Sequence, residues 1–348
     1  MTSQVAVDCE HHVIVERLED LASYLPAGWL ARLSMGEFAM PRPGPHPGAE
    51  LGAGPAPGGT VPATAAAALD PGTTHAVLVP SQPLVSSGWL GGRMAAVFSS
   101  AVNDFVADGW LPADPRFRFA ISVAPHDGEA AAEEVRRLGS HPGAVGVSFS
   151  PVQVNLGQKH YHPIYEAAVE HDLAVIVHPG GFEGNVLGPA ALGGVGPRTP
   201  EDTFCLLPQV AMSAISSLVF DGTLEQFPRL RVVLAGFGFG WAPPVIWRMD
   251  SEWRGLRVEV PWLTRAPSEV IADQVRFVVD AAVERDAGTW MLARMLPESS
   301  LVYGSDAPFS GGGPGVLAGS DDELRARIVG DNALDTFQRL QAPATIAA

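Results

Sequence analysis

Four side chains of this sequence could bind a metal ion together, and they come from three separate parts of the chain. Glu10 and His12 lie two residues apart in VDCEHHVI, a spacing that places both side chains on one side of an extended segment. His178 ends the apolar run LAVIVH, and Asp306 follows LVYGS. Two imidazoles and two carboxylates suit Zn²⁺ or Mn²⁺, with one or two coordination positions left open to solvent.

Each of these residues also has an ordinary structural interpretation. A Glu-x-His pair at the end of a strand can be a cap or a surface feature, and a single histidine can be hydrogen-bonded in the core. The aspartate of GSD can cap a helix. A metal site is therefore possible only if the strands and helices bring these three parts of the chain together.

Those elements are predicted by eight short runs rich in branched apolar residues, which are typical of strands buried on both faces of a parallel sheet. Helical patterns lie between several of them, including 129–138, 163–171 and 208–226. The seventh run could equally continue a helix. The eight runs are 5–9, 76–79, 119–123, 144–148, 174–177, 231–235, 275–279 and 301–303.

Eightfold alternation of strand and helix predicts an α/β fold, a (β/α)₈ TIM barrel. Catalytic residues of such barrels lie at the carboxyl ends of the strands. The first, fifth and eighth runs end just before Glu10, His178 and Asp306. This coincidence supports a metal site, while the structural interpretations stay open.

Composition narrows the class of function. The 348 residues carry 22 basic and 38 acidic side chains, a formal net charge of −16, which disfavours nucleic acid and anionic membranes as partners. The two cysteines, Cys9 and Cys205, cannot form a disulfide framework, and the N-terminus lacks the pattern of a secretory signal. We therefore expect a cytoplasmic protein that acts on a small molecule.

A segment rich in proline and glycine interrupts the alternation of strands and helices between the first and second apolar runs. Residues 41–64 consist mostly of proline, glycine and alanine, with almost nothing to bury. We interpret them as a long excursion within the first crossover and expect a single barrel domain over residues 1–348.

The chain resembles the amidohydrolase-related family of the amidohydrolase superfamily, in the group of aminocarboxymuconate-semialdehyde and resorcylate decarboxylases. VDCEHHVI resembles the family's opening motif, and LVYGSDAPF resembles its eighth-strand aspartate. The segments of the fifth strand, the sixth strand and the C-terminal helix also match in order. They are YHPIYEAAVEHDLAVIVHPGGFEGN, SLVFDGTLEQFPRLRVVLAGFGFGWAPPVIWRMDSEWRG and RIVGDNALDTF.

This resemblance implies a TIM barrel of the metal-dependent hydrolase type. It implies one divalent metal ion, Zn²⁺ or Mn²⁺, held by Glu10, His12, His178 and Asp306. Because dimers are common among relatives, it also allows a homodimer.

The chain departs from the family around this site. Gly236 stands where relatives carry a histidine or glutamate after the sixth strand, and Phe309 stands where they carry a histidine after the eighth. The fourth run also ends at Ser148, without the carboxylated lysine of the binuclear members. The metal ligands are therefore expected to be intact and the proton-transfer groups around them to be altered.

Further residues are candidates for the substrate pocket. Gly236 and Phe309 would give it an apolar wall, and Trp241 could contribute to that wall or pack between helix and barrel. Lys159 and His160 lie on the catalytic side after the fourth run, where either could contact substrate or have a structural role.

The expected reaction is non-oxidative decarboxylation of an unsaturated or aromatic carboxylic acid, with Asp306 as general acid and base. Hydrolysis of an amide or lactone is the alternative among enzymes. Loss of the sixth-strand side chain also allows a repurposed biosynthetic cyclase or a vestigial barrel that has lost the family's chemistry.

Overall fold

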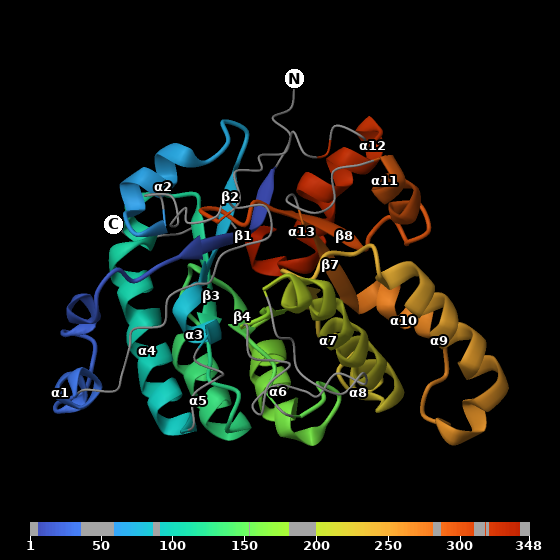
Figure 1. Ribbon diagram of the computed structural model, residues 1–348, viewed down its shortest axis with the longest axis horizontal. Helices are drawn as coiled ribbons and strands as arrows, with labels where there is room; N and C mark the ends of the chain where they lie inside the picture. The colour runs from blue at the N-terminus through green and yellow to red at the C-terminus, as the bar shows by residue number, and fades with distance from the viewer. Residues whose placement is uncertain are drawn as a thin grey trace.

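The protein forms a barrel of eight parallel strands with helices outside it (Figure 1). The computed structural model describes residues 6–35, 59–85, 91–152, 154–180, 200–280, 287–309, 317 and 320–341. The predicted TIM barrel is confirmed, and the seventh run is a strand. The strands are β1 Val7–Val13, β2 His75–Pro80, β3 Phe117–Ser122, β4 Ala144–Phe149, β5 Ala174–Val177, β6 Val232–Leu234, β7 Val275–Asp280 and β8 Leu301–Gly304.

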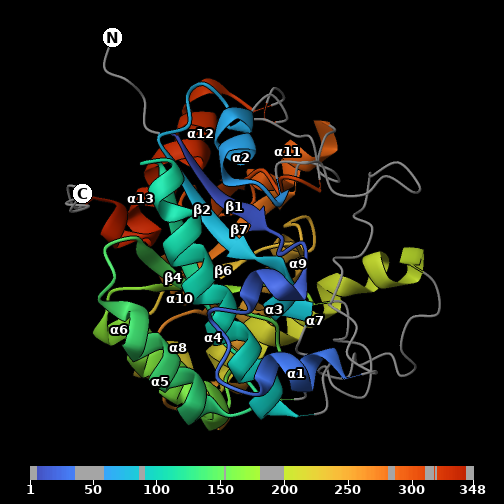
Figure 2. The same cartoon turned by 90° about the vertical axis from the view of Figure 1, so that its left-hand side faces the viewer.

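The helices lie mainly around the outside of the strands, and α4, α5 and α6 run side by side there (Figures 1 and 2). The longer helices are α4 Gly92–Gly109, α5 Gly128–Gly139, α6 His162–Glu170, α7 Pro200–Phe220, α9 Ala242–Leu256 and α10 Pro267–Gln274. The short α-helices are α1 Trp29–Ser34, α2 Pro62–Ala68, α3 Ser81–Val85, α8 Thr223–Gln226, α11 Ala287–Ala293, α12 Asp322–Ala326 and α13 Asn332–Thr336. The 3₁₀ helices are η1 Leu18–Leu21, η4 Leu111–Ala113, η5 Lys159–Tyr161, η6 Arg257–Glu259 and η9 Gln338–Gln341, and η8 Arg327–Asp331 is a π-helix.

Most predicted strands match the observed ones to within one or two residues, and two predicted elements differ more. β1 continues to Val13, so Glu10 and His12 lie within the first strand and not after it. The helix predicted at 208–226 is two helices, because Gly222 at φ +80° separates α7 from α8. Pro208 lies inside α7 instead of starting it. Residues 41–58 of the proline-rich segment lie outside the described residues.

Two hydrophobic cores hold the barrel together. The larger one lies between the strands and the helices around them. The smaller one contains side chains from all eight strands and therefore fills the barrel itself, as in other TIM barrels. Its strand members are Val7, Cys9, Val77, Val79, Ala120, Val145, Ala174, Ile176, Val233, Val278 and Val302, and Ala235 directly follows β6.

The end of the described chain closes one mouth of the barrel. Ala333 of α13, Phe337 between α13 and η9, and Leu340 of η9 belong to the inner core, and we call these three residues the plug. The Nδ2 group of Asn332 donates to the carbonyl oxygens of Glu298 and Leu301, at 2.7 and 2.8 Å. Since Leu301 begins β8, this plug lies at the amino ends of the strands and leaves the carboxyl ends for a site.

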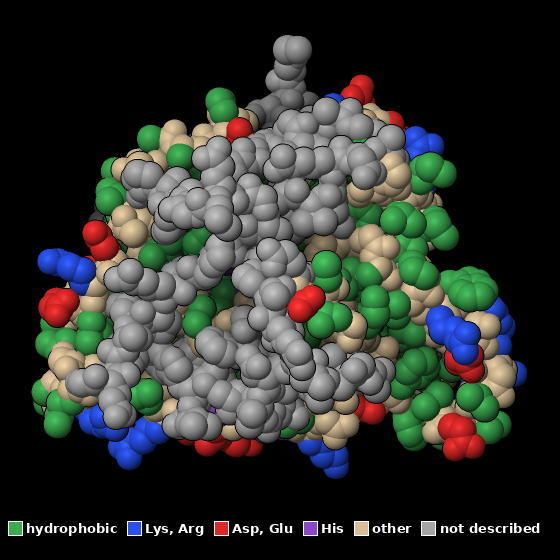
Figure 3. Space-filling model, in the orientation of Figure 1, with side chains coloured by type: hydrophobic (Ala, Val, Ile, Leu, Met, Phe, Trp, Pro, Cys, Tyr) green, Lys and Arg blue, Asp and Glu red, His purple; other side chains and the backbone are tan. Residues whose placement is uncertain are grey.

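The surface view shows hydrophobic side chains over α9 and its neighbours, among charged groups (Figure 3). Trp247, Leu256, Val258 and Trp262 are the large exposed apolar side chains of this stretch. None of the described helices is both long and apolar enough to span a membrane.

The plug gives a stability prediction. Phe337 is fully buried in the inner core, so Phe337→Ala leaves a cavity at the amino end of the barrel. We expect the free energy of unfolding to fall by about 3–5 kcal/mol, measured by urea denaturation. Val258→Ala, at a side chain that is 79% exposed, should change it little. Equal effects of the two substitutions would contradict this role of Phe337.

Candidate metal centre

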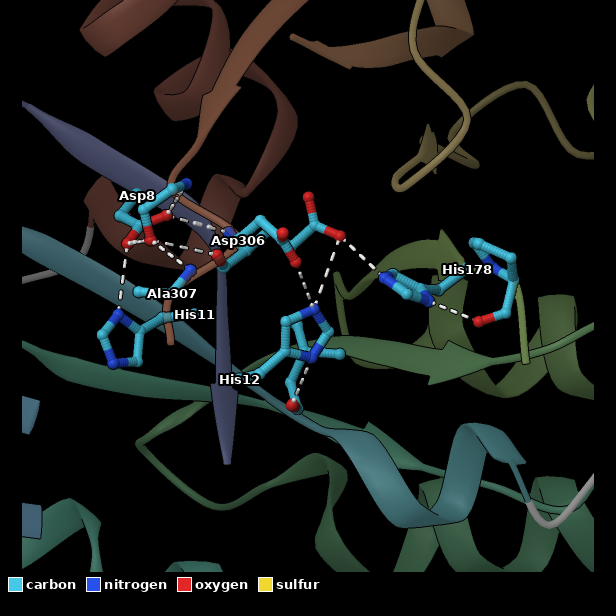
Figure 4. A network of polar contacts seen from close by, with 10 residues as sticks. Asp8, His11, His12, His178, Asp306 and Ala307 are labelled. Atoms are coloured by element: carbon cyan, nitrogen blue, oxygen red, sulfur yellow. Dashed lines mark hydrogen bonds and ion pairs between the residues drawn. The ribbon is translucent and has the colours of Figure 1, made fainter. Parts of the chain in front are cut away.

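The structure brings the four predicted ligands together at the carboxyl end of the barrel. Glu10 and His12 come from β1, His178 directly follows β5, and Asp306 comes two residues after β8. All four side chains are buried. Figure 4 shows His12, His178 and Asp306 pointing toward a common centre.

A β-bulge in β1 turns two of these side chains into the barrel. Between Asp8 and His11 the pairing with β2 shifts by one residue, so Cys9 and Glu10 occupy the place of one residue. Cys9 lies in the core inside the barrel. With strict alternation, Glu10 and His12 would face the opposite way from Cys9. The extra residue therefore places both ligand side chains on the inside.

Asp306 is placed by the seam between β8 and β1. Its amide donates to the carbonyl oxygen of Glu10 at 2.9 Å, and the amide of His12 donates to the carbonyl oxygen of Ala307 at 2.7 Å. Asp306 has φ +52°, in the left-handed region that aspartate tolerates better than most residues. This turn lets the chain leave β8 with the carboxylate beside His12.

The two histidines are oriented by backbone carbonyl groups. Nδ1 of His12 lies 3.2 Å from the oxygen of Val79, and Nδ1 of His178 lies 2.7 Å from the oxygen of Pro179. A carbonyl oxygen only accepts, so each Nδ1 carries a hydrogen and Nε2 is the ring nitrogen that faces the centre. Such outer hydrogen bonds are typical of metal-binding histidines.

At the centre, imidazole nitrogens face carboxylate oxygens at short distances. Nε2 of His178 lies 2.8 Å from Oε1 of Glu10, and Nε2 of His12 lies 3.3 Å from Oδ1 of Asp306. A lone pair facing a carboxylate is repulsive unless a proton or a cation lies between them. Donor atoms of Glu10, His12 and His178 all lie within 4.8 Å of one another. The residues therefore fit one divalent cation.

The electrostatics of the protein groups agree with this fit. Burial alone would lower the pKa of His12, but Asp306 and Glu10 raise it to about 10. Burial raises the pKa of Asp306 to about 7, against the opposing effect of His12. Burial would also raise the pKa of Glu10, yet hydrogen bonds and charge from His12 and His178 hold it below its usual range. The centre thus attracts positive charge.

Gly236 and Phe309 border this centre. A Cβ atom at Gly236 would lie 3.1 Å from Nε2 of His178 and 2.9 Å from Cδ of Pro179, and the residue has φ +73°. A histidine or glutamate therefore has no room there in this backbone. The ring of Phe309 lies 5.2 Å from the imidazole of His12, at an interplanar angle of 62°.

The other predicted pocket residues make contacts of their own. Trp241 is buried against Phe277, with ring centroids 5.6 Å apart, and its Nε1 donates to the carbonyl oxygens of Phe237 and Gly238. These contacts favour its packing interpretation. Lys159 is exposed in η5, and the ring of His160 contacts Tyr161 and the carbonyl oxygen of Pro125.

Two residues at the centre were missed by sequence reasoning. Asp8 accepts hydrogen bonds from β1 and from Ser305 after β8. Gly304 lies so close to Glu10 that an added Cβ would be 2.8 Å from the Cβ of Glu10. Both lie in the quoted motifs VDCEHHVI and LVYGSDAPF, so their position next to ligands was the available signal.

Comparison with known proteins now decides the family. A family model described as Amidohydrolase matches residues 7–339. The chain belongs to the amidohydrolase family. A 2-amino-3-carboxymuconate-6-semialdehyde decarboxylase of Dictyostelium discoideum is 27% identical over 266 residues, 73% of this chain and 70% of the relative.

Two further proteins are similar over different extents. A gamma-resorcylate decarboxylase of Rhodococcus jostii (strain RHA1) is 28% identical over 182 residues, 46% of this chain and 50% of that protein. A solved structure of a dihydroxybenzoic acid decarboxylase from Polaromonas sp. JS666, with bound manganese and the inhibitor 2-nitroresorcinol, superposes with a TM-score of 0.63. It is 18% identical, covers 99% of this chain and 100% of that one, and shows the shared fold.

The close approach at Gly236 gives a prediction. Gly236→Ala should push the side chain of His178 out of position, so the purified protein should retain much less divalent metal, measured by elemental analysis. Gly28→Ala is the matched control, because Gly28 also has a positive φ, +83°, but nothing lies within 4 Å of an added Cβ. Equal metal contents of the two variants would show that the contact with His178 is unimportant.

Proposed function

We propose that this protein is a metal-dependent, non-oxidative decarboxylase of an unsaturated or aromatic carboxylic acid. The observation that carries the proposal is the buried set of Glu10, His12 and His178 donor atoms, with Asp306 beside them. The decarboxylase names of both curated relatives support the reaction class. One barrel domain would carry the activity.

The four residues Glu10, His12, His178 and Asp306 would hold one divalent ion. The manganese in the similar solved structure supports Mn²⁺, and the nitrogen and oxygen donors also suit Zn²⁺. When bound, such an ion supplies positive charge that polarises a substrate oxygen. The carbonyl partners of Val79 and Pro179 keep the two imidazoles aimed at it.

Asp306 would move the proton. In decarboxylation the bond between the ring or vinyl carbon and the carboxylate carbon breaks, CO₂ leaves, and the electron pair stays on the ring or vinyl carbon. That carbon then takes a proton from the Asp306 carboxyl group, which recovers a proton from solvent before the next turnover. General acid catalysis of this kind contributes about 10²–10⁴-fold to a rate.

Gly236 and Phe309 would shape the surroundings of this step. Phe309 places an apolar ring 5.2 Å from the imidazole of His12, and Gly236 contributes no side chain beside His178. Hydrolysis needs a polar group to orient and deprotonate an attacking water. Two positions beside the centre that carry no polar side chain, with Asp306 as proton donor, support decarboxylation over hydrolysis.

Metal removal tests the proposal. The purified protein should contain about one divalent ion per chain, and removal by a chelator should abolish CO₂ release from a panel of hydroxylated benzoates. Readdition of Mn²⁺ or Zn²⁺ should restore it.

His178→Ala should lose most of the metal, because it removes a direct ligand. His162→Ala, in α6 and packed against Phe227, serves as a histidine control that should keep the metal. Hydrolysis of esters or lactones without CO₂ release from any acid would overturn the decarboxylase assignment, and absence of metal would overturn the site.

Asp306→Asn isolates the proton-transfer role. Asparagine also tolerates a positive φ, so the turn should survive while the base is lost. We expect kcat to fall about 10²–10⁴-fold with little change in Tm, measured by steady-state kinetics and thermal denaturation.

The control is Asp172→Asn, an exposed aspartate with φ +53° that contacts Arg229 on the surface. It should leave kcat unchanged. Near-wild-type turnover by Asp306→Asn would remove Asp306 from the mechanism.

A further inference from the structure

We infer that Asp8 is the positioning residue of the metal centre, because its one carboxylate both shapes the bulge of β1 and fastens β8 to it. Asp8 does not face the centre and is not a ligand. The inference rests on the proposed function, since it concerns the arrangement of the residues that would hold the metal.

Asp8 first makes a hydrogen bond within β1. Its Oδ1 atom accepts a hydrogen bond from the amide of Glu10 at 3.2 Å. An aspartate that binds the amide two residues ahead stabilises a local turn in the backbone. Here that turn coincides with the extra residue between Asp8 and His11. The same contact therefore stabilises the shift that aims Glu10 and His12 inward.

Asp8 also accepts hydrogen bonds from the segment that follows β8. Ser305, the residue before Asp306, donates its amide to Oδ1 at 2.8 Å and its hydroxyl to Oδ2 at 2.6 Å. The Ser305 hydroxyl in turn accepts from the amide of Ala307 at 3.1 Å. Figure 4 shows Asp8 and Ala307 in this network beside Asp306. Hydrogen bonds of Ser305 and Ala307, the residues before and after Asp306, therefore stabilise the turn that contains Asp306.

Burial makes these contacts strong. Asp8 is 3% exposed, so its hydrogen bonds do not compete with water. Hydrogen bonds to a charged acceptor stabilise more than neutral ones. His11 is also buried, with Nδ1 3.4 Å from Oδ2 of Asp8. Three of the four candidate ligand residues, two in β1 and one in the turn after β8, thus depend on one carboxylate.

The test compares Asp8→Ala, Asp8→Asn and wild type by metal affinity. Mn²⁺ binding is measured by competition with a chelator, and the visible absorption of the Co²⁺-loaded protein reports ligand geometry. We expect Asp8→Ala to bind Mn²⁺ about 10–100-fold more weakly, the usual cost of losing an outer partner of metal ligands. Its Co²⁺ spectrum should change. Asp8→Asn keeps one acceptor oxygen, so its Mn²⁺ affinity should lie between those of Asp8→Ala and wild type.

Asn103→Ala controls for general destabilisation. Asn103 joins α4 to β3 through two 2.8 Å hydrogen bonds with the backbone of Ser122, away from the ligands. It should lower Tm as Asp8→Ala does, yet keep wild-type Mn²⁺ affinity and Co²⁺ spectrum.

The outcomes separate this inference from the proposed function. A wild-type protein that binds no metal overturns both. A wild-type protein that binds metal, together with unchanged affinity and spectrum in Asp8→Ala, overturns only the role of Asp8. If Asp8→Ala does not fold, Asp8→Asn decides, with about 10-fold weaker binding expected and wild-type affinity overturning the inference.

Discussion

The single inserted residue in β1 is the constraint on which the site depends. In a regular strand, inward and outward side chains alternate, and Cys9 already occupies an inward position in the barrel core. Glu10 and His12 can then face inward only because the pairing with β2 shifts between Asp8 and His11. A slip of one residue would send both candidate ligands into the outer core, so the candidate metal centre depends directly on the bulge.

Closure of the barrel and assembly of the site are equally linked. The seam between β8 and β1 is made by backbone hydrogen bonds of Glu10, His12, Asp306 and Ala307, the same short segments that carry three of the candidate ligands. A cation held by residues on β1, by His178 after β5 and by Asp306 after β8 would fasten distant parts of the chain together. Metal binding in such a site contributes to the stability of the fold. The plug around Phe337 stabilises the opposite mouth without touching the site.

The sequence was most informative where a physical pattern repeats. Eight apolar runs predicted the eight strands, and the ends of three of them predicted that Glu10, His178 and Asp306 would meet. The bulge was not predictable, because a shift in pairing leaves no periodic trace in seven residues. The end of β1 was therefore placed too early. The role of Asp8 depends on contacts with Ser305, 297 positions away, which residue spacing alone cannot reveal.

The two departures from the family pattern have a common physical meaning in this site. Gly236 is not simply a lost side chain, since its positive φ and the nearness of His178 leave no space for one. Phe309 covers the other side, next to His12. The four candidate ligand side chains are buried, and charges at buried positions interact more strongly, which would favour retention of a cation and of an anionic substrate. A proton delivered to carbon by Asp306 needs no bound water, whereas attack by water would need the polar groups that these positions lack. The same two residues that depart from the family pattern therefore favour proton transfer to carbon over hydrolysis.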